Sequence, residues 1–111
     1  MKYIITENKL EQIIISYLNK YYGDLEEYRT DKYSKSIFFV KNKKVYMEYV
    51  LMYHKLWVDT TIWSDLENIF SLERRDTKSI IKKWVEDTYN LKGVNPLPDT
   101  IFYQHRWKEI F

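Results

Sequence analysis

The hydrophobic and polar residues at positions 36–53 follow the two-residue period of a β-hairpin. The run S-I-F-F-V-K-N-K-K-V-Y-M-E-Y-V-L-M-Y predicts two strands around a polar, basic turn. Asn42-Lys43 is an unfavourable two-residue turn, because lysine lacks the tolerance of positive φ that glycine gives an Asn-Gly turn. A four-residue loop over 41–44 avoids that cost and keeps the same facing of the side chains. We expect the rest of the chain to be organised around this hairpin.

The register of the hairpin assigns its side chains to two faces. With the turn at 42–43, Val40 pairs with Val45 and Phe38 pairs with Met47. One face is then apolar and is predicted to receive the helices; it holds Phe38, Val40, Val45, Met47, Tyr49 and Leu51. The other face is mixed, and is either half-covered or available to a partner; it holds Ile37, Phe39, Tyr46, Glu48 and Val50.

Apolar residues recur at helical spacing in three stretches, which predict helices over 7–22, 59–71 and 77–91. A stripe of this kind usually packs in the core of a globular domain. The stripe of the first helix is expected to do so; it comprises Leu10, Ile13, Ile14, Tyr17, Leu18 and Tyr21.

Capping residues indicate where these helices begin and end. Gly23 stops the first helix. Asp59 or Thr60 is the expected N-cap of the second helix, which could also reach back to Lys55. Asp76-Thr77 is the expected cap of the third.

These elements predict a single α+β domain over residues 1–111. It consists of a small antiparallel sheet, centred on the hairpin, with the three helices packed on one face. The polar residues 23–35 are predicted to form a loop, and the prolines within 95–99 predict a break in regular structure. The stretch 100–111 carries apolar residues throughout, so we expect it to dock on its own domain, closing an edge of the sheet, or on another chain.

Composition excludes several kinds of chemistry. No cysteine is present, which removes disulfides, thiolate zinc sites and cysteine nucleophiles. Two glycines are too few for a glycine-rich phosphate loop. His105 and Glu109 would supply only two metal ligands, and His54 has no histidine partner at i,i+4 spacing. We therefore expect no metal site, no cofactor and no catalytic residues, and enzymatic activity is not indicated.

Basic residues gather around the hairpin although the formal net charge is only +2. Residues 31–60 hold six lysines against three acidic residues, and lysines on a hairpin can contact phosphates. Charged side chains also keep sheet edges from pairing with other chains, which is the alternative explanation. The candidates for nucleic-acid contact are Lys32, Lys35, Lys41, Lys43 and Lys44.

Aromatic residues make up 18% of the chain, more than a core of this size easily hides. The 14 lysines, 12 isoleucines and 11 tyrosines, with no alanine, indicate an AT-rich gene, so lysine and tyrosine carry little functional weight. Tryptophan has a G-rich codon and is the better signal, and aromatic residues are enriched at protein interfaces. We assign Trp84 to the core. The interface candidates are Trp57, Trp63, Tyr103 and Trp107.

Two stretches resemble small uncharacterised proteins encoded by marine bacteriophages. They are M-K-Y-I-I-T-E-N-K-L at the start, and Phe70-Ser71-Leu72 together with I-I-K-K-W-V-E-D-T-Y-N-L-K at 80–92. The resemblance covers only part of the chain and brings no known activity or catalytic residues. It implies an accessory or structural component that works in the cytoplasm of the host cell.

We therefore expect a non-enzymatic interaction protein that acts through aromatic contacts, either as a homo-oligomer or with a protein partner. The alternative is a nucleic-acid-binding module that uses the hairpin lysines. A membrane partner is not expected, because no stretch approaches the roughly 18 apolar residues of a transmembrane helix. A soluble, cytoplasmic protein is the expectation that follows.

Overall fold

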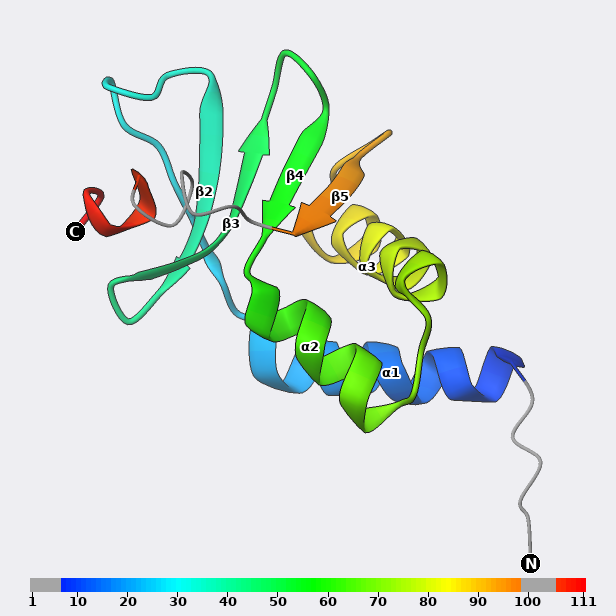
Figure 1. Cartoon of the computed structure of the whole chain (residues 1–111). Helices are drawn as coiled ribbons and strands as arrows, with labels where there is room; N and C mark the ends of the chain where they lie inside the picture. Colours follow the sequence, from blue (N-terminus) through cyan, green and yellow to red (C-terminus); the bar gives the residue numbers. More distant parts are fainter. Residues whose placement is uncertain (1–6, 99–105) are drawn as a thin grey trace, which may run out of the picture.

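The computed structural model describes residues 7–98 and 106–111, and within them the chain has the predicted α+β architecture (Figure 1). Along the chain, one helix is followed by four strands, two helices and a fifth strand. They are α1 (Glu7–Tyr22), β1 (Glu26–Tyr28), β2 (Ser36–Lys41), β3 (Lys44–Val50), β4 (Lys55–Val58), α2 (Thr60–Ile69), α3 (Arg74–Tyr89) and β5 (Asn95–Pro98).

The five strands form one mixed sheet in the order β1-β2-β3-β4-β5. The first four are antiparallel neighbours, whereas β5 lies parallel to β4. The purely antiparallel sheet of the prediction is therefore extended by one parallel strand. The reason is the connection: α2 and α3 form a crossover that returns the chain to the sheet in the direction of β4.

A β-bulge in the central hairpin corrects the predicted register. Val40 pairs with Val45 as expected, but Phe39, not Phe38, pairs with Met47. Tyr46 is the extra residue on β3, and such an insertion rotates the strand by one position relative to its neighbour. All side chains of β3 beyond Tyr46 therefore point to the face opposite to the one predicted from a regular ladder.

Both faces of the hairpin are consequently apolar, and the helices cover only one of them. The helix-covered core takes its hairpin residues from positions that the regular register had divided between the two faces: Ile37, Phe39, Met47 and Tyr49. Strand β4 adds Leu56 and Val58. The three helices contribute Ile14, Leu18, Ile62, Trp63, Leu66, Ile81, Trp84 and Val85. The second face carries a smaller cluster of Phe38, Val40, Val45 and Trp107.

The tail segment, residues 106–111, covers this second face. Its helical turn lies over β2 and β3 on the side away from the helices (Figure 1). Trp107 is 7% exposed and Ile110 packs against the same cluster. The segment docks on its own domain, as one of the two predicted alternatives, but over a face of the sheet and not along an edge.

The hairpin has the two-residue turn at Asn42-Lys43, which is unfavourable by its sequence. Lys41 pairs directly with Lys44, and Asn42 and Lys43 have φ of 52° and 62°. These values describe a two-residue turn with both residues in the left-handed region, not the four-residue loop. Asn42 tolerates this conformation, but a lysine there costs about 1–2 kcal/mol.

The helix ends agree with the prediction in part. The side chain of Asp59 accepts a hydrogen bond from the Thr61 amide at 2.9 Å and caps α2, and Leu56–Val58 belongs to β4, so α2 does not reach back to Lys55. Helix α3 begins at Arg74, three residues before the predicted start. Thr77 is therefore not a cap: it is buried within the helix, and its hydroxyl donates to the Glu73 carbonyl.

Two short edge strands lie where the sequence predicted irregular structure: β1 within the loop over 23–35, and β5 within the proline-containing stretch 95–99. The three residues of β1 are exposed and pair with β2 through the backbone, so their side chains give no strand signal. In β5 every second residue is a proline, at positions 96 and 98. Proline has no backbone N–H, which is tolerated at the edge of a sheet. The Asn95 amide instead donates to the His54 carbonyl at 2.8 Å.

The phenol of Tyr89, at the end of α3, holds the end of α1 in place. It donates to the Tyr22 carbonyl and accepts from the Leu25 amide at 3.2 Å. Burial raises the pKa of Tyr89 to about 12. Tyr22 is affected in the same way, because burial and the nearby Asp65 carboxylate raise the pKa of its phenol.

Replacing Lys43 by glycine should stabilise the domain by about 1 kcal/mol, because glycine adopts the left-handed conformation without steric cost. The free energy of unfolding in urea measures the effect. Lys43→Ala is the matched control: it removes the charge but keeps the β-carbon, so it should give no such gain. Equal stabilisation by Lys43→Gly and Lys43→Ala would contradict the explanation that the left-handed conformation of Lys43 is strained.

Tyr89 should make the domain sensitive to alkali. Its phenol ionises near pH 10 in the unfolded chain and near 12 in the fold, so the folded state binds the proton more tightly. The stability from this group is full below pH 10 and is lost as the pH rises toward 12. Tyr89→Phe should lower stability at pH 7 by about 1–2 kcal/mol, through the lost hydrogen bonds, and should flatten the decline between pH 10 and 12. Urea unfolding across this range tests both effects.

Candidate functional site

A buried carboxylate lies on the second face of the sheet. The bulge turns Glu48 of β3 toward this face, where its side chain is fully buried. Its Oε2 accepts from the Ser36 hydroxyl at 2.8 Å, and its Oε1 accepts from the Trp107 indole N–H at 3.0 Å. Arg106 completes the set, with its Nη2 at 3.1 Å from Oε2.

Arg106 and Trp107 therefore attach the tail segment through charge as well as through apolar contact. The Arg106 guanidinium also lies over the Tyr33 ring, 4.0 Å from its centroid, and the Tyr33 hydroxyl donates to Glu109 at 3.1 Å. The Glu48 side chain is fully buried among these groups, so the arrangement attaches the tail segment to the sheet.

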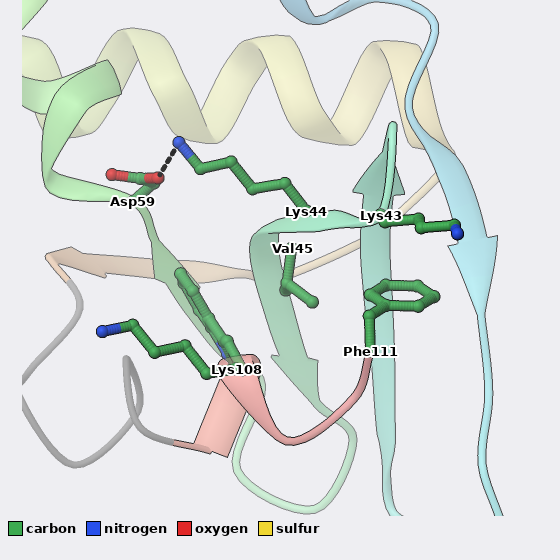
Figure 2. A pocket seen from close by; sticks show the side chains of 7 residues that line it. Lys43, Lys44, Val45, Asp59, Lys108 and Phe111 are labelled. Atoms are coloured by element: carbon green, nitrogen blue, oxygen red, sulfur yellow. Dashed lines mark ion pairs between the residues drawn. The ribbon is translucent and has the colours of Figure 1, made fainter.

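The tail segment creates a pocket where it meets the hairpin turn and the start of α2 (Figure 2). The cavity has a volume of about 370 Å³, within the range of small-molecule sites. We call it the lysine pocket; it is lined by Lys43, Lys44, Val45, Asp59, Trp107, Lys108 and Phe111.

Most of the lysines predicted to contact nucleic acid have acidic partners. Lys41 pairs with Asp24 at 2.9 Å, Lys44 with Asp59 at 3.4 Å and Lys32 with Glu109 at 3.6 Å. Lys35 and Lys43 have no acidic partner within ion-pair distance among the described residues, but they lie at opposite ends of β2. The five lysines do not converge on one site.

The predicted interface tryptophans lie mostly inside the protein. Trp63 is 1% exposed in the helix-covered core, Trp107 is buried between the tail segment and the sheet, and Trp57 is half-buried beside the second cluster. Tyr103 and His105 lie outside the described residues. Trp84 is a core residue, as predicted, and its indole N–H donates to Asn19 at 2.9 Å.

A different set of apolar side chains is exposed, on α1 and α2. Helix α1 buries Ile14 and Leu18, but Ile13 and Tyr21 of the same predicted stripe are 42% and 48% exposed. They are therefore not core residues. Tyr17 stands between them and contacts the ring of Phe70 at the end of α2, 5.6 Å between centroids. We call this surface the helix patch; it comprises the exposed Ile13, Tyr21 and Ile69 and the partly buried Tyr17 and Phe70.

Sequence reasoning missed both the helix patch and the set around Glu48. The signal for the patch was present: six apolar residues on α1 make a stripe wider than one contact face needs. A single glutamate between Met47 and Tyr49 was also visible, but its burial depends on the bulge. The position of the lysine pocket could not be found, because it requires the fold of the tail segment.

Within the described ranges 7–98 and 106–111, no group of three or more His, Asp or Glu side chains could hold a metal ion. In the same ranges no helix is long and apolar enough to cross a bilayer.

Comparison with known proteins finds no family model, no curated protein and no solved structure that matches this chain. The resemblance to phage proteins therefore stays a prediction.

Breaking the pair on the second face should destabilise the domain strongly. Arg106→Met leaves the Glu48 carboxylate buried without its counter-charge, which should cost about 2–3 kcal/mol. Replacing both residues by methionine should recover a large part of that loss, since neither charge is then buried. Urea unfolding of both single variants and of the double variant measures their coupling; strictly additive effects would contradict a direct ion pair.

Proposed function

We propose that this protein is a non-enzymatic interaction protein that binds another protein chain through the helix patch. One observation carries the proposal: α1 buries only part of its apolar surface in its own domain and leaves two large apolar side chains exposed. Ile14 and Leu18 are fully buried, whereas Ile13 and Tyr21 remain exposed, and Ile69 at the end of the neighbouring α2 is 56% exposed. Burial of such side chains against a partner removes apolar surface from water.

The composition of the patch also suits a protein partner. Tyrosine combines a large apolar ring with a polar tip, and it is enriched at interfaces. The hydroxyls of Tyr17 and Tyr22 donate to Asp65, which fixes the rings and places a carboxylate at the rim. Arg74 pairs with Glu67 at 2.7 Å nearby and adds further polar groups. An apolar centre with a polar rim is the usual organisation of a protein interface.

The edges of the sheet offer a poorer route to association. Strand β1 has only three residues and presents Glu26 and Glu27, while β5 carries Pro96 and Pro98. Short, charged or proline-containing edges disfavour the addition of a further strand. Contact through helix side chains is therefore the favoured mode.

Nucleic-acid binding by the hairpin lysines is the alternative function, and it has less support. The ion pairs of Lys32, Lys41 and Lys44 reduce the charge that they offer to phosphates. The other two candidates are separated by the length of β2, which is about 20 Å for a six-residue strand.

Light scattering over micromolar concentrations, combined with a pulldown from cells that contain the native partners, tests the proposal. We expect a mass that rises with concentration or a specifically captured protein. Ile13→Glu and Tyr21→Glu should each reduce that association at least about tenfold, since a charge would be buried at the contact. Met52→Glu is the matched control, because Met52 is 57% exposed but lies in the β3–β4 turn, away from the patch.

A monomer at all concentrations, together with no captured partner, would overturn the proposal. Association that is weakened equally by Met52→Glu would also overturn it, because the contact would then not be made by the helix patch.

A further inference from the structure

We propose that the lysine pocket binds a small organic anion that combines a planar apolar ring with a carboxylate or phosphate group. This site is separate from the helix patch, and the inference does not depend on the proposed interaction function. It rests on the three properties of the pocket that decide what can enter it: an apolar floor, a surplus of positive charge at the rim, and a limited size.

The floor of the pocket is apolar and partly rigid. Val45 and Trp107 belong to the buried cluster on the second face, and Trp107 is fixed by its hydrogen bond to Glu48. Phe111 stands at one side and is 53% exposed, and its ring centroid lies 5.2 Å from that of Tyr28. A flat ring placed on this floor would gain apolar and aromatic contact without displacing any core residue.

The rim of the pocket is positively charged. Lys43, Lys44 and Lys108 surround the floor, and among the described residues Asp59 is the only acidic side chain that lines it. Asp59 pairs with Lys44, whereas neither Lys43 nor Lys108 has an acidic partner within ion-pair distance among the described residues. Two ammonium groups are thus left to attract an anion.

The three ammonium groups lie around the floor and do not meet at one point. Figure 2 shows Lys44 directed toward Asp59, Lys43 extending on the side of Phe111, and Lys108 extending in another direction. Lysine is a flexible point charge, so each side chain can turn toward an anion at the edge of a bound ring. The arrangement suits a ligand held mainly by its ring, with its charge at the rim.

The size and surroundings of the pocket favour a small ligand over a nucleic-acid strand. A cavity of about 370 Å³ holds one ring system with a short substituent. Beyond Phe111 the surface continues into a groove lined by Asp24 and Glu26 as well as by Lys41. A polyanion that extended along this groove would meet these carboxylates.

Two-dimensional ¹H–¹⁵N NMR of the full chain tests the site, because Trp107 lines the pocket and its indole N–H, which donates to Glu48, gives a separate signal. The probes are naphthalene-2-carboxylate and adenosine monophosphate, each with its neutral counterpart, naphthalene-2-methanol and adenosine. We expect a saturable shift of the Trp107 indole signal for at least one anion, with its neutral counterpart at least about tenfold weaker. The Trp84 indole signal, on the helix side, should not move.

Two variants test whether the ammonium groups of Lys43 and Lys108 contribute to binding of the anion. Lys43→Gln and Lys108→Gln should each weaken binding about threefold to fivefold, in line with partly exposed ion pairs. Lys82→Gln is the matched control, since Lys82 is an exposed lysine of α3 on the other side of the sheet. The naphthoate and nucleotide arms separate a carboxylate ligand from a phosphate ligand.

Three results would overturn the inference. They are the absence of any saturable Trp107 shift at millimolar probe, equal affinity for the anion and its neutral counterpart, and equal weakening by Lys82→Gln. An oligothymidylate that saturates the same signal at concentrations about a hundredfold below those of the mononucleotide would assign the surface to nucleic acid instead.

Discussion

The fold depends on one constraint: the central hairpin has two apolar faces, and each needs its own cover. The bulge at Tyr46 produces this situation, because it sends Val45 to one face and Met47 to the other. In a regular ladder the two side chains would share a face. Three helices cover the Met47 side, and the tail segment covers the Val45 side. The tail segment is therefore part of the core and not an appendage.

The same bulge explains the buried carboxylate. Glu48 follows Met47, so it must point to the second face, where Ser36, Arg106 and Trp107 surround it. A carboxylate buried alone would cost several kcal/mol, but three partners satisfy it here. The planar guanidinium of Arg106 can donate to the carboxylate while it lies over the Tyr33 ring, which an ammonium group could not do as well. The net contribution to stability is modest, but the position of the tail segment becomes unique.

Local sequence signals predicted much of the fold. Helical spacing gave α1, α2 and α3 within three residues of their ends, and alternation gave the central hairpin with its Val40–Val45 pair. The bulge could not be predicted from local signals. Lysine is unfavourable in the left-handed conformation at position 43, so the two-residue turn and the bulge next to it depend on the packing of both faces of the hairpin. Strands β1 and β5 also follow from tertiary context, since Glu-Glu-Tyr and Asn-Pro-Leu-Pro become strands only beside an existing sheet edge.

The exposure and pairing of the candidate site residues were harder to predict than the helices and strands. Tryptophan content indicated exposed anchors, but a large ring is equally suited to a core, and Trp63 and Trp107 are buried. Whether a lysine is available to a ligand depends on which acidic residue the fold places next to it. The pairs of Lys41 with Asp24 and of Lys44 with Asp59 join residues 17 and 15 positions apart in the sequence. Which of the candidate lysines and tryptophans can contact a ligand or partner is decided by their exposure and their ion pairs in the folded chain.

Helix α2 connects the two proposed binding surfaces: Asp59 caps its beginning beside the lysine pocket, and Ile69 ends it within the helix patch. Asp59 uses its two oxygens differently, since Oδ1 accepts from the Thr61 amide and Oδ2 pairs with Lys44. An anion that draws Lys44 into the pocket would therefore leave the cap of α2 in place. The Lys44 side chain is 54% exposed, so its pair with Asp59 is weak enough to exchange. Occupation of the pocket thus need not disturb α2, and the proposals for the two surfaces do not depend on each other.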